Sequence, residues 1–318
     1  MVDINELDKK ILTAPTNRRS DRHRMSFGEK MGDEYKGLEA YPRVDMLTAV
    51  GTIPTKKLKK FETLVNTSAY FNLLDGGGPQ TVKAKSVDNK VFIEFVGLRK
   101  NQLRAQFNPN KMNQEERRNL IKNVLKFIPE YHFSRLDLAI DLNVNLSDYF
   151  IYSDVATKTT VHSGLTGRME TKYIGTRNSD KFIRIYNKKQ EVNDKQKFED
   201  DDDFFLSEVD QNFYEGQHWW RVEVELKRNR TDDWKYSFDQ LHLVKPKWKN
   251  IEKNTDRAMV FMLLSDDAEW ANLDYRTRKR YKEMISEMTD VDLNIVLKEV
   301  IRVYEKDLQD ELNYWIVL

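Results

Sequence analysis

Three segments of this chain, residues 134–142, 181–186 and 220–227, alternate residue by residue between apolar and other side chains. Successive side chains of a β-strand point to opposite faces, so a period of two predicts strands with one apolar and one polar face. Antiparallel sheets commonly carry a core on one face and leave the other to solvent or to charged groups. The pattern therefore predicts a sheet with one face packed on the core and a second face that carries charged side chains, which could form a functional site.

Helical periodicity accompanies these strands. The segment 55–65 follows a proline and presents an apolar face, and apolar residues recur at three- and four-residue spacing from 293 to 315. A further helix is expected from Ser147. The combination predicts an α+β fold with a central mixed or antiparallel sheet, flanking helices and a helical C-terminal region. The predicted regions are a partly mobile basic arm at 1–40, an α+β region at 41–230, built from units of similar design at 41–129 and 130–230, and a mainly helical region at 231–318.

Composition limits the classes of function. The chain has 318 residues and no cysteine, which excludes disulfide bonds and thiolate metal sites. It contains no apolar run long enough to span a membrane and no secretory leader, so a cytoplasmic protein without membrane association is expected. No Gly-x-x-x-x-Gly-Lys loop is present either, and no nucleotide cofactor site is predicted.

The formal net charge of +1 conceals local segregation. Basic residues gather at 17–30 and again at 271–282, whereas 199–203 is an acidic run. Separate basic clusters are typical of a protein with local nucleic-acid contacts rather than one that coats a polyanion along its whole surface. A solvated helix face is the alternative interpretation of each cluster.

Tyr186 ends one of the alternating runs and shares its predicted face with Arg184. A guanidinium group can grip phosphate oxygens in a bidentate manner, and lysine can serve as a point charge. Four more basic residues lie nearby in sequence: Arg177, Lys181, Lys188 and Lys189. The pattern indicates a tyrosine nucleophile beside a bound phosphate. An amphipathic surface tyrosine is the alternative, since the chain has 14 tyrosines.

Carboxylates lie on the polar faces of two other strands: Asp137 and Asp141 on one, Glu223 and Glu225 on the other. Buried carboxylates require a cation or several hydrogen bonds. Mg²⁺ or Mn²⁺ would suit four such oxygen ligands, and the scattered histidines disfavour zinc. A structural ion network with neighbouring arginines is the equally weighted alternative.

The segments 135–141, 173–191 and 220–228, in this order, resemble the replication initiators of Gram-positive rolling-circle plasmids, the Rep_trans family. A looser similarity continues through 238–248 and 270–273 to the C-terminal helix. The resemblance covers about the last two-thirds of the chain, and the first 110 residues carry less of it.

The resemblance implies that Tyr186 nicks one strand of a double-stranded plasmid origin and stays joined to the 5′ phosphate. Arg184 and a divalent metal are the candidates to stabilise the phenolate. The family's dependence on Mg²⁺ or Mn²⁺ transfers to the four carboxylates, among which Asp141 and Glu223 are favoured as ligands. The α+β region at 41–230 would then be the nicking region.

The resemblance further implies a superfamily 1 helicase as partner and a homodimer. Origin recognition and dimerisation would belong to 231–318, where one aromatic and five basic residues are the candidates for DNA contact: Trp270, Arg276, Arg278, Lys279, Arg280 and Lys282. A basic surface helix is the alternative. Two other functions remain open: a non-catalytic origin-binding or repressor protein, and a metal nuclease that uses water as its nucleophile.

Overall fold

The computed structural model describes residues 25–27, 33–67, 69–75, 80–97, 100–155, 158–197 and 206–316. Most of the predicted basic arm, including the basic cluster at 17–30 apart from 25–27, lies outside these residues. The acidic run at 199–203 also lies outside them. The part of the arm that is described contributes a short strand and the start of the longest strand of the fold.

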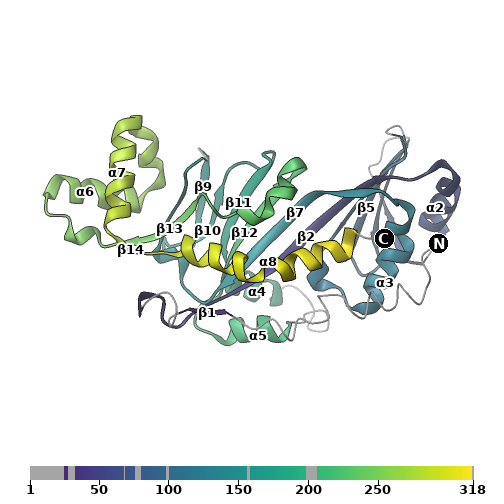
Figure 1. Ribbon diagram of the computed structural model, residues 1–318, viewed down its shortest axis with the longest axis horizontal. Coiled ribbons are helices and arrows are strands. Elements are labelled where there is room, and N and C mark those ends of the chain that lie inside the picture. The colour runs from purple at the N-terminus through teal and green to yellow at the C-terminus, as the bar shows by residue number, and fades with distance from the viewer. Residues whose placement is uncertain are drawn as a thin grey trace.

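The fold is organised around an 11-stranded sheet in which the described neighbours pair antiparallel (Figure 1). The strand order is β3-β4-β5-β6-β2-β7-β12-β11-β10-β9, and β1 pairs with β2 beside this path. The strands are β1 (Met25–Phe27), β2 (Leu38–Thr52), β3 (Phe71–Leu74), β4 (Thr81–Ser86), β5 (Val91–Val96), β6 (Gln102–Phe107), β7 (Tyr131–Leu142), β9 (Thr159–Ser163), β10 (Met169–Ile174), β11 (Lys181–Asn187) and β12 (Trp220–Lys227).

The centre of the sheet is the pair β2 and β7, strands of 15 and 12 residues. β2 has β6 on one side and β7 on the other, so the strands of segments 41–129 and 130–230 join in one continuous sheet. The apolar residues of β7 and β12 enter one large core, as their alternation predicted. The α+β class with a large antiparallel sheet is confirmed, while the proposed domain boundaries stay predictions.

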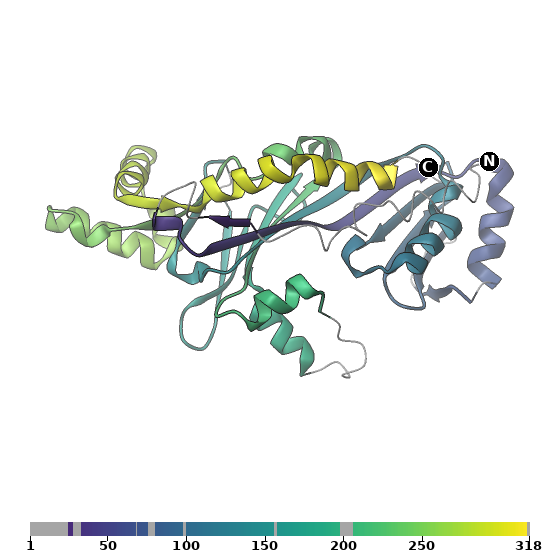
Figure 2. The same cartoon turned by 60° about the horizontal axis from the view of Figure 1, so that its bottom comes forward.

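Helices cover both faces of this sheet unequally. The long helix α8 (Leu293–Ile316) lies along the apolar face, where Leu297, Val300 and Trp315 are fully buried. The shorter helices α4 (Lys188–Gln196) and α5 (Glu208–Glu215) lie on the other side of the sheet, as Figure 2 shows in green opposite the yellow α8. They form a small core with Tyr41 and Trp219. The carboxylates of β7 and β12 on this face are all buried.

Two further helices, α2 (Thr55–Thr67) and α3 (Gln114–Asn123), lie near the opposite end of the sheet from α6 (Asn254–Ser265) and α7 (Tyr275–Glu287), as Figure 1 shows. Asn113 begins α3 with a capping box: its side chain accepts a hydrogen bond from the Glu116 backbone, and the Glu116 side chain accepts one from the Asn113 backbone. This reciprocal arrangement satisfies two helix-terminal donors, and the Asn-x-x-Glu spacing is its signature in the sequence.

A second, smaller lobe projects from one end of the sheet (Figure 1). It contains the three-stranded sheet β14-β13-β8 and two helices, with its own apolar core. Its elements are β8 (Phe150–Ser153), β13 (Leu241–Pro246), α6 (Asn254–Ser265), α7 (Tyr275–Glu287) and β14 (Thr289–Asp292). On β13, His242 hydrogen-bonds Asp292 and Asp154 at 3.0 Å each, and these bonds raise the pKa of the imidazole.

The helix expected from Ser147 is absent. Ser147 lies in a single 3-10 turn, Leu146–Asp148, in which the Asn145 side chain accepts a hydrogen bond from the Ser147 backbone. The chain then enters β8, because long-range pairing with β13 outweighs the local helical pattern. None of the helices in the described part of the chain is both long and apolar enough to cross a membrane.

Candidate active site

Four neighbouring strands, β11, β12, β7 and β2, bring the predicted site residues into transverse rows on one face of the sheet. In that strand order the rows are Tyr186, Arg221, Asp141 and Tyr41; then Arg184, Glu223, Ala139 and Arg43; then Phe182, Glu225, Asp137 and Met46. Tyr186, Arg184 and the four predicted carboxylates thus lie on a common face. This arrangement follows from the period of two and from the antiparallel register.

Asp141 is held by two arginines. Its carboxylate accepts hydrogen bonds from Arg221 Nε at 2.6 Å and Arg221 Nη2 at 3.0 Å, and it also pairs with Arg43. Arg43 reaches across to Asp210 on α5 at 2.8 Å. Asp141 is completely buried, so these contacts compensate for its lost hydration. Both oxygens are engaged, which leaves this carboxylate poorly placed to bind a metal.

Asp137 and Glu225 belong to a second ion network, at the far end of the same face. Arg135 contacts Asp137 at 2.7 Å and Glu225 at 2.7 Å, and Lys227 also pairs with Glu225. Burial nonetheless raises the pKa of Asp137 to about 7, against the opposing effect of Arg135. Around these two carboxylates the structure contains the ion network that the sequence left open as an alternative.

Glu223 differs from the other three carboxylates. One of its oxygens, Oε1, pairs with the Arg184 guanidinium, with Nε at 3.1 Å. The other, Oε2, is buried and has no hydrogen-bond partner within the described structure. Burial raises the pKa of Glu223, and the negative charge of Asp45 raises it further. An unpartnered buried carboxylate oxygen is costly, and it marks a position suited to a cation.

Asp45 is the site residue that sequence reasoning missed. It lies at a β-bulge of β2, where the register against β7 shifts between Val44 and Met46. Its carboxylate contacts Arg221 Nη1 at 3.2 Å and Asn108 Nδ2 at 3.4 Å. Burial works to raise its pKa, but the surrounding cations, Arg221 first, bring the pKa below the usual value. The available signal was an acidic residue within an apolar strand.

Tyr186 retains some solvent exposure but lies in a charged setting. Burial raises the pKa of its phenol well above the usual value; Arg221 opposes this rise, while Glu223 and Asp45 add to it. Two cations flank the ring: Arg184 and Lys188 lie 5.7 and 5.8 Å from its centroid. The phenol is therefore neutral at ordinary pH. A nucleophilic role requires additional positive charge near its oxygen.

Glu223 and Asp45 are the carboxylates that best fit a divalent metal ion. Among the described residues, no group of three or more Asp, Glu or His side chains is arranged to hold one. Mg²⁺ nevertheless often binds through one or two carboxylates, with water and substrate phosphates completing its coordination. The unpartnered Glu223 Oε2 and the charge of nearby Asp45 satisfy that smaller requirement.

The basic residues around β11 divide into two groups. Lys188 and Lys189 begin α4; Lys188 lies over the Tyr186 ring and pairs with Glu191 at 2.5 Å. Lys181 lies at the other end of β11, and strand alternation places it on the opposite face from Tyr186. Arg177 lies in the turn before that end, with its guanidinium 5.8 Å from the Phe182 ring. Of these four residues, Lys188 is the one placed over the Tyr186 ring, whereas the Lys189 ammonium donates to the Gly216 carbonyl at 2.7 Å.

The six C-terminal candidates lie in the projecting lobe, away from Tyr186. Trp270 packs on Phe150 with ring centroids 5.4 Å apart, and its indole donates to the Leu263 carbonyl at 2.8 Å. Arg278 donates to the carbonyls of Trp270 and Leu273, at 3.2 and 3.0 Å. Both residues therefore support the lobe.

The remaining four of these candidates are on α7. Arg280 pairs with Asp256 at 2.7 Å, and Lys282 lies 4.9 Å from the Tyr152 ring centroid. Arg276 and Lys279 are exposed on the same side of the helix, three residues apart. Lys279 pairs with Glu283 at 3.7 Å, an exposed pair that a phosphate could replace, so both side chains are accessible to DNA.

Comparison with known proteins agrees with the motifs. A family model described as the N-terminal part of a replication initiation protein matches residues 46–128. A replication initiation protein of Staphylococcus aureus is 37% identical over 321 residues, which cover 99% of this chain and 94% of that protein. Another from the same species is 38% identical over 276 residues, 85% of this chain and 84% of the relative.

These matches correct one expectation. The first 110 residues were expected to carry less of the resemblance, yet the family model lies largely within them and the first relative spans almost the whole chain. The solved structure of a rolling circle replication initiator protein from Geobacillus stearothermophilus is also similar, with 17% identity and a TM-score of 0.39, covering 69% of this chain and 91% of that one. That likeness is too low to support an inference.

Proposed function

The chain belongs to the family of replication initiation proteins, and we propose that it starts rolling-circle replication by nicking plasmid origin DNA with Tyr186. This proposal is supported most directly by the charged groups around the Tyr186 phenol. Arg184, Lys188 and Arg221 supply positive charge around it, and Glu223 presents an unpartnered oxygen on the same face. A tyrosine that merely packed would not need this set of charges.

In the proposed reaction the Tyr186 oxygen attacks the scissile phosphorus and the bond from phosphorus to the 3′ oxygen breaks. The phenol loses its proton to solvent, and the departing 3′ oxygen takes one up. The product is a 5′-phosphotyrosine and a free 3′ hydroxyl, which can prime synthesis. One phosphodiester replaces another, so reversal can rejoin the strand without a nucleotide triphosphate.

The residues near Tyr186 have distinct parts in this step. Arg184 and Lys188 would bind the scissile phosphate and stabilise the negative charge that develops on it. Glu223 and Asp45 would hold Mg²⁺ or Mn²⁺. A metal ion bound there supplies the positive charge that lowers the cost of forming a phenolate and a pentacovalent phosphate. Asp137, Asp141 and Glu225 would hold the arginines and strands in register.

Origin recognition would fall to the C-terminal lobe, through Arg276 and Lys279 on the exposed side of α7. Lysine and arginine meet phosphates and can read guanine edges in a major groove. The lobe projects from the sheet (Figure 1), which separates this contact from the sheet face that carries Tyr186, Arg184 and Glu223, here called the nicking face. A superfamily 1 helicase and a second copy of the chain are the proposed partners, both on the basis of the family.

A labelled oligonucleotide can test the nicking reaction. We would incubate the protein with an end-labelled single strand from the origin of its own plasmid, with Mg²⁺ or Mn²⁺, and look for a denaturant-resistant protein–DNA adduct. Tyr186→Phe removes the attacking oxygen and keeps the ring, so the adduct should disappear. Tyr173→Phe is the matched control, because Tyr173 lies on the neighbouring strand, opposite Arg184.

Two outcomes would overturn the proposal. Origin binding without cleavage would identify a non-catalytic origin-binding or repressor protein. Cleavage without an adduct, or an adduct that survives Tyr186→Phe, would identify water or another side chain as the nucleophile. Chelation of the metal should abolish the adduct and leave binding to duplex origin DNA intact.

A further inference from the structure

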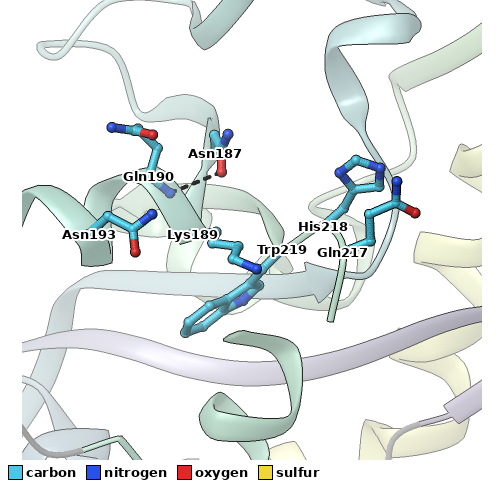
Figure 3. A pocket seen from close by; sticks show the side chains of 7 residues that line it. All are labelled: Asn187, Lys189, Gln190, Asn193, Gln217, His218 and Trp219. Carbon is cyan, nitrogen blue, oxygen red and sulfur yellow. Dashed lines mark hydrogen bonds between the residues drawn. The ribbon is translucent and has the colours of Figure 1, made fainter. Parts of the chain in front are cut away.

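A small polar pocket adjoins the nicking face. It has a volume of about 130 Å³ and lies between the beginning of α4 and the segment that leads into β12 (Figure 3). No carboxylate is among the described side chains that line the pocket. The lining includes Asn187, Lys189, Asn193, His218 and Trp219. The pocket is therefore polar and free of negative charge.

The two asparagines present hydrogen-bond donors to this pocket. Asn187 Oδ1 accepts a hydrogen bond from the Gln190 backbone at 3.1 Å, the dashed line in Figure 3. Asn193 Oδ1 accepts one from the Tyr214 hydroxyl at 2.9 Å. A backbone N–H can only donate, so the first bond fixes which Asn187 side-chain atom is oxygen, and in the second the Tyr214 hydroxyl donates to Asn193 Oδ1. The NH₂ groups are what remains available to a ligand.

Lys189 and Trp219 add a positive charge and another donor. The Lys189 ammonium donates to the neutral Gly216 carbonyl at 2.7 Å and has no acidic partner within the described structure. Trp219 is 1% exposed, and its indole nitrogen is buried without a hydrogen-bond partner among the described residues. A buried donor left unsatisfied is unusual and suggests that an acceptor occupies the site at some stage of function.

This donor set favours one class of ligand. Phosphodiester oxygens only accept hydrogen bonds and carry a negative charge, whereas the edges of the bases combine donors with acceptors. Several N–H donors around one ammonium, without a carboxylate, therefore suit a phosphate better than a base. The volume of the pocket also suits one compact group.

The pocket lies next to the proposed nucleophile. Asn187 directly follows Tyr186, and the Lys188 ammonium lies 5.8 Å from the Tyr186 ring centroid and 6.0 Å from that of Trp219. A single strand with its scissile phosphate at Tyr186 would pass this pocket. We infer that the pocket binds a backbone phosphate of a nucleotide adjoining the nick, and so fixes the register in which the scissile phosphate meets Tyr186. This inference rests on the proposed nicking function.

Charge removal on both partners can test the contact. In a Tyr186→Phe background, which prevents cleavage, we would measure binding of origin oligonucleotides that carry a neutral methylphosphonate at one position at a time. Lys189→Gln removes the charge and keeps a donor for the Gly216 carbonyl. Its expected effect is a decrease of about 0.7 in the slope of log affinity against log salt, the value for one phosphate contact on a single strand. At one phosphate beside the nick, the loss of binding free energy caused by the methylphosphonate and the loss caused by Lys189→Gln should not add, because both changes remove the same contact.

Two further variants sharpen the result. Lys197→Gln is the matched control, because Lys197 directly follows α4 but is exposed and pairs with Asp194. Any loss of binding free energy that it causes should add to the loss caused by a methylphosphonate at every position. Trp219→Phe keeps an aromatic ring and removes the donor, and it should reproduce the non-additivity at the same phosphate. Additive losses at every position for Lys189→Gln would overturn the inference. If wild-type protein forms the adduct in that case, the nicking proposal stands, whereas absence of any adduct would refute nicking itself.

Discussion

Replacing Asp141 by asparagine should destabilise the fold much more than replacing Glu223 by glutamine. Asp141 is fully buried and balances two buried guanidinium groups, those of Arg221 and Arg43. Asparagine keeps the volume but loses the charge, so both cations remain buried with only Asp45 and Asp210 to balance them. Removing one partner of a buried ion pair typically costs about 3–5 kcal/mol. At about 2 °C per kcal/mol for a chain of this size, the melting temperature should fall by roughly 6–10 °C.

Glu223→Gln should change stability by no more than about 1 kcal/mol, because burial already raises the pKa of Glu223 and so disfavours its charged form, and Arg184, about one-third exposed, remains hydrated without its partner. The substitution also relieves repulsion by Asp45. This variant should instead lose nicking.

Urea unfolding followed by tryptophan fluorescence would measure both changes, and the adduct assay would measure nicking. Asp233→Asn is the control, since Asp233 and its partner Arg230 are exposed and the change should hardly alter the unfolding midpoint. If Asp141→Asn unfolded like the wild type and abolished metal-dependent nicking, Asp141 would be a metal ligand rather than a structural anion.

Four other variants test separate parts of the structure. The pKa of His242 is raised in the folded state, so the stability that the protonated imidazole contributes should be complete below about pH 6.5, the unfolded value. That contribution should be lost as the pH rises through the folded pKa. Urea unfolding from pH 5.5 to 8.5 should show the fall in stability, and His242→Asn should abolish this pH dependence. Replacing Arg276 and Lys279 by alanine should weaken binding to duplex origin DNA and reduce the salt dependence of that binding, while cleavage of single strands is preserved. Arg278→Ala should instead lower the melting temperature, because Arg278 donates hydrogen bonds to two backbone carbonyls. Gly51→Ala should reduce stability, since an added Cβ would come within 2.9 Å of a side-chain carbon of a packed neighbour; an unchanged melting temperature would contradict that packing.

The sequence predicts what depends on local periodicity. Because side chains alternate along a strand, the common face of Tyr186 and Arg184 follows from their spacing alone, and so does that of Glu223 and Glu225. The long terminal helix and the capping box at Asn113 are local patterns of the same kind.

Contacts between distant segments could not be predicted in this way. The pairing of Arg43 with Asp141 depends on the register of β2 against β7, which the bulge at Asp45 shifts by one residue. The same bulge turns Asp45 toward Arg221, although it lies in an apolar run. In the basic segment of α7, Arg278 is directed to backbone carbonyls by the turn before the helix, which charge counting cannot reveal.

The charges around Tyr186 suggest why a metal ion and DNA should bind together. Five cations and five anions form the ion pairs around the phenol: Arg43, Arg184, Lys188, Lys195 and Arg221, with Asp45, Asp141, Glu191, Asp210 and Glu223. With all ten charged, these formal charges cancel, so an arriving phosphate makes the site negative and opposes phenolate formation further. A divalent cation held by Glu223 would supply positive charge and so reverse the effect. Because coupling between two ligands is reciprocal, DNA should increase the affinity for the metal by the same factor as the metal increases the affinity for DNA. Equal metal affinity with and without a single-stranded origin oligonucleotide would contradict this account of the site.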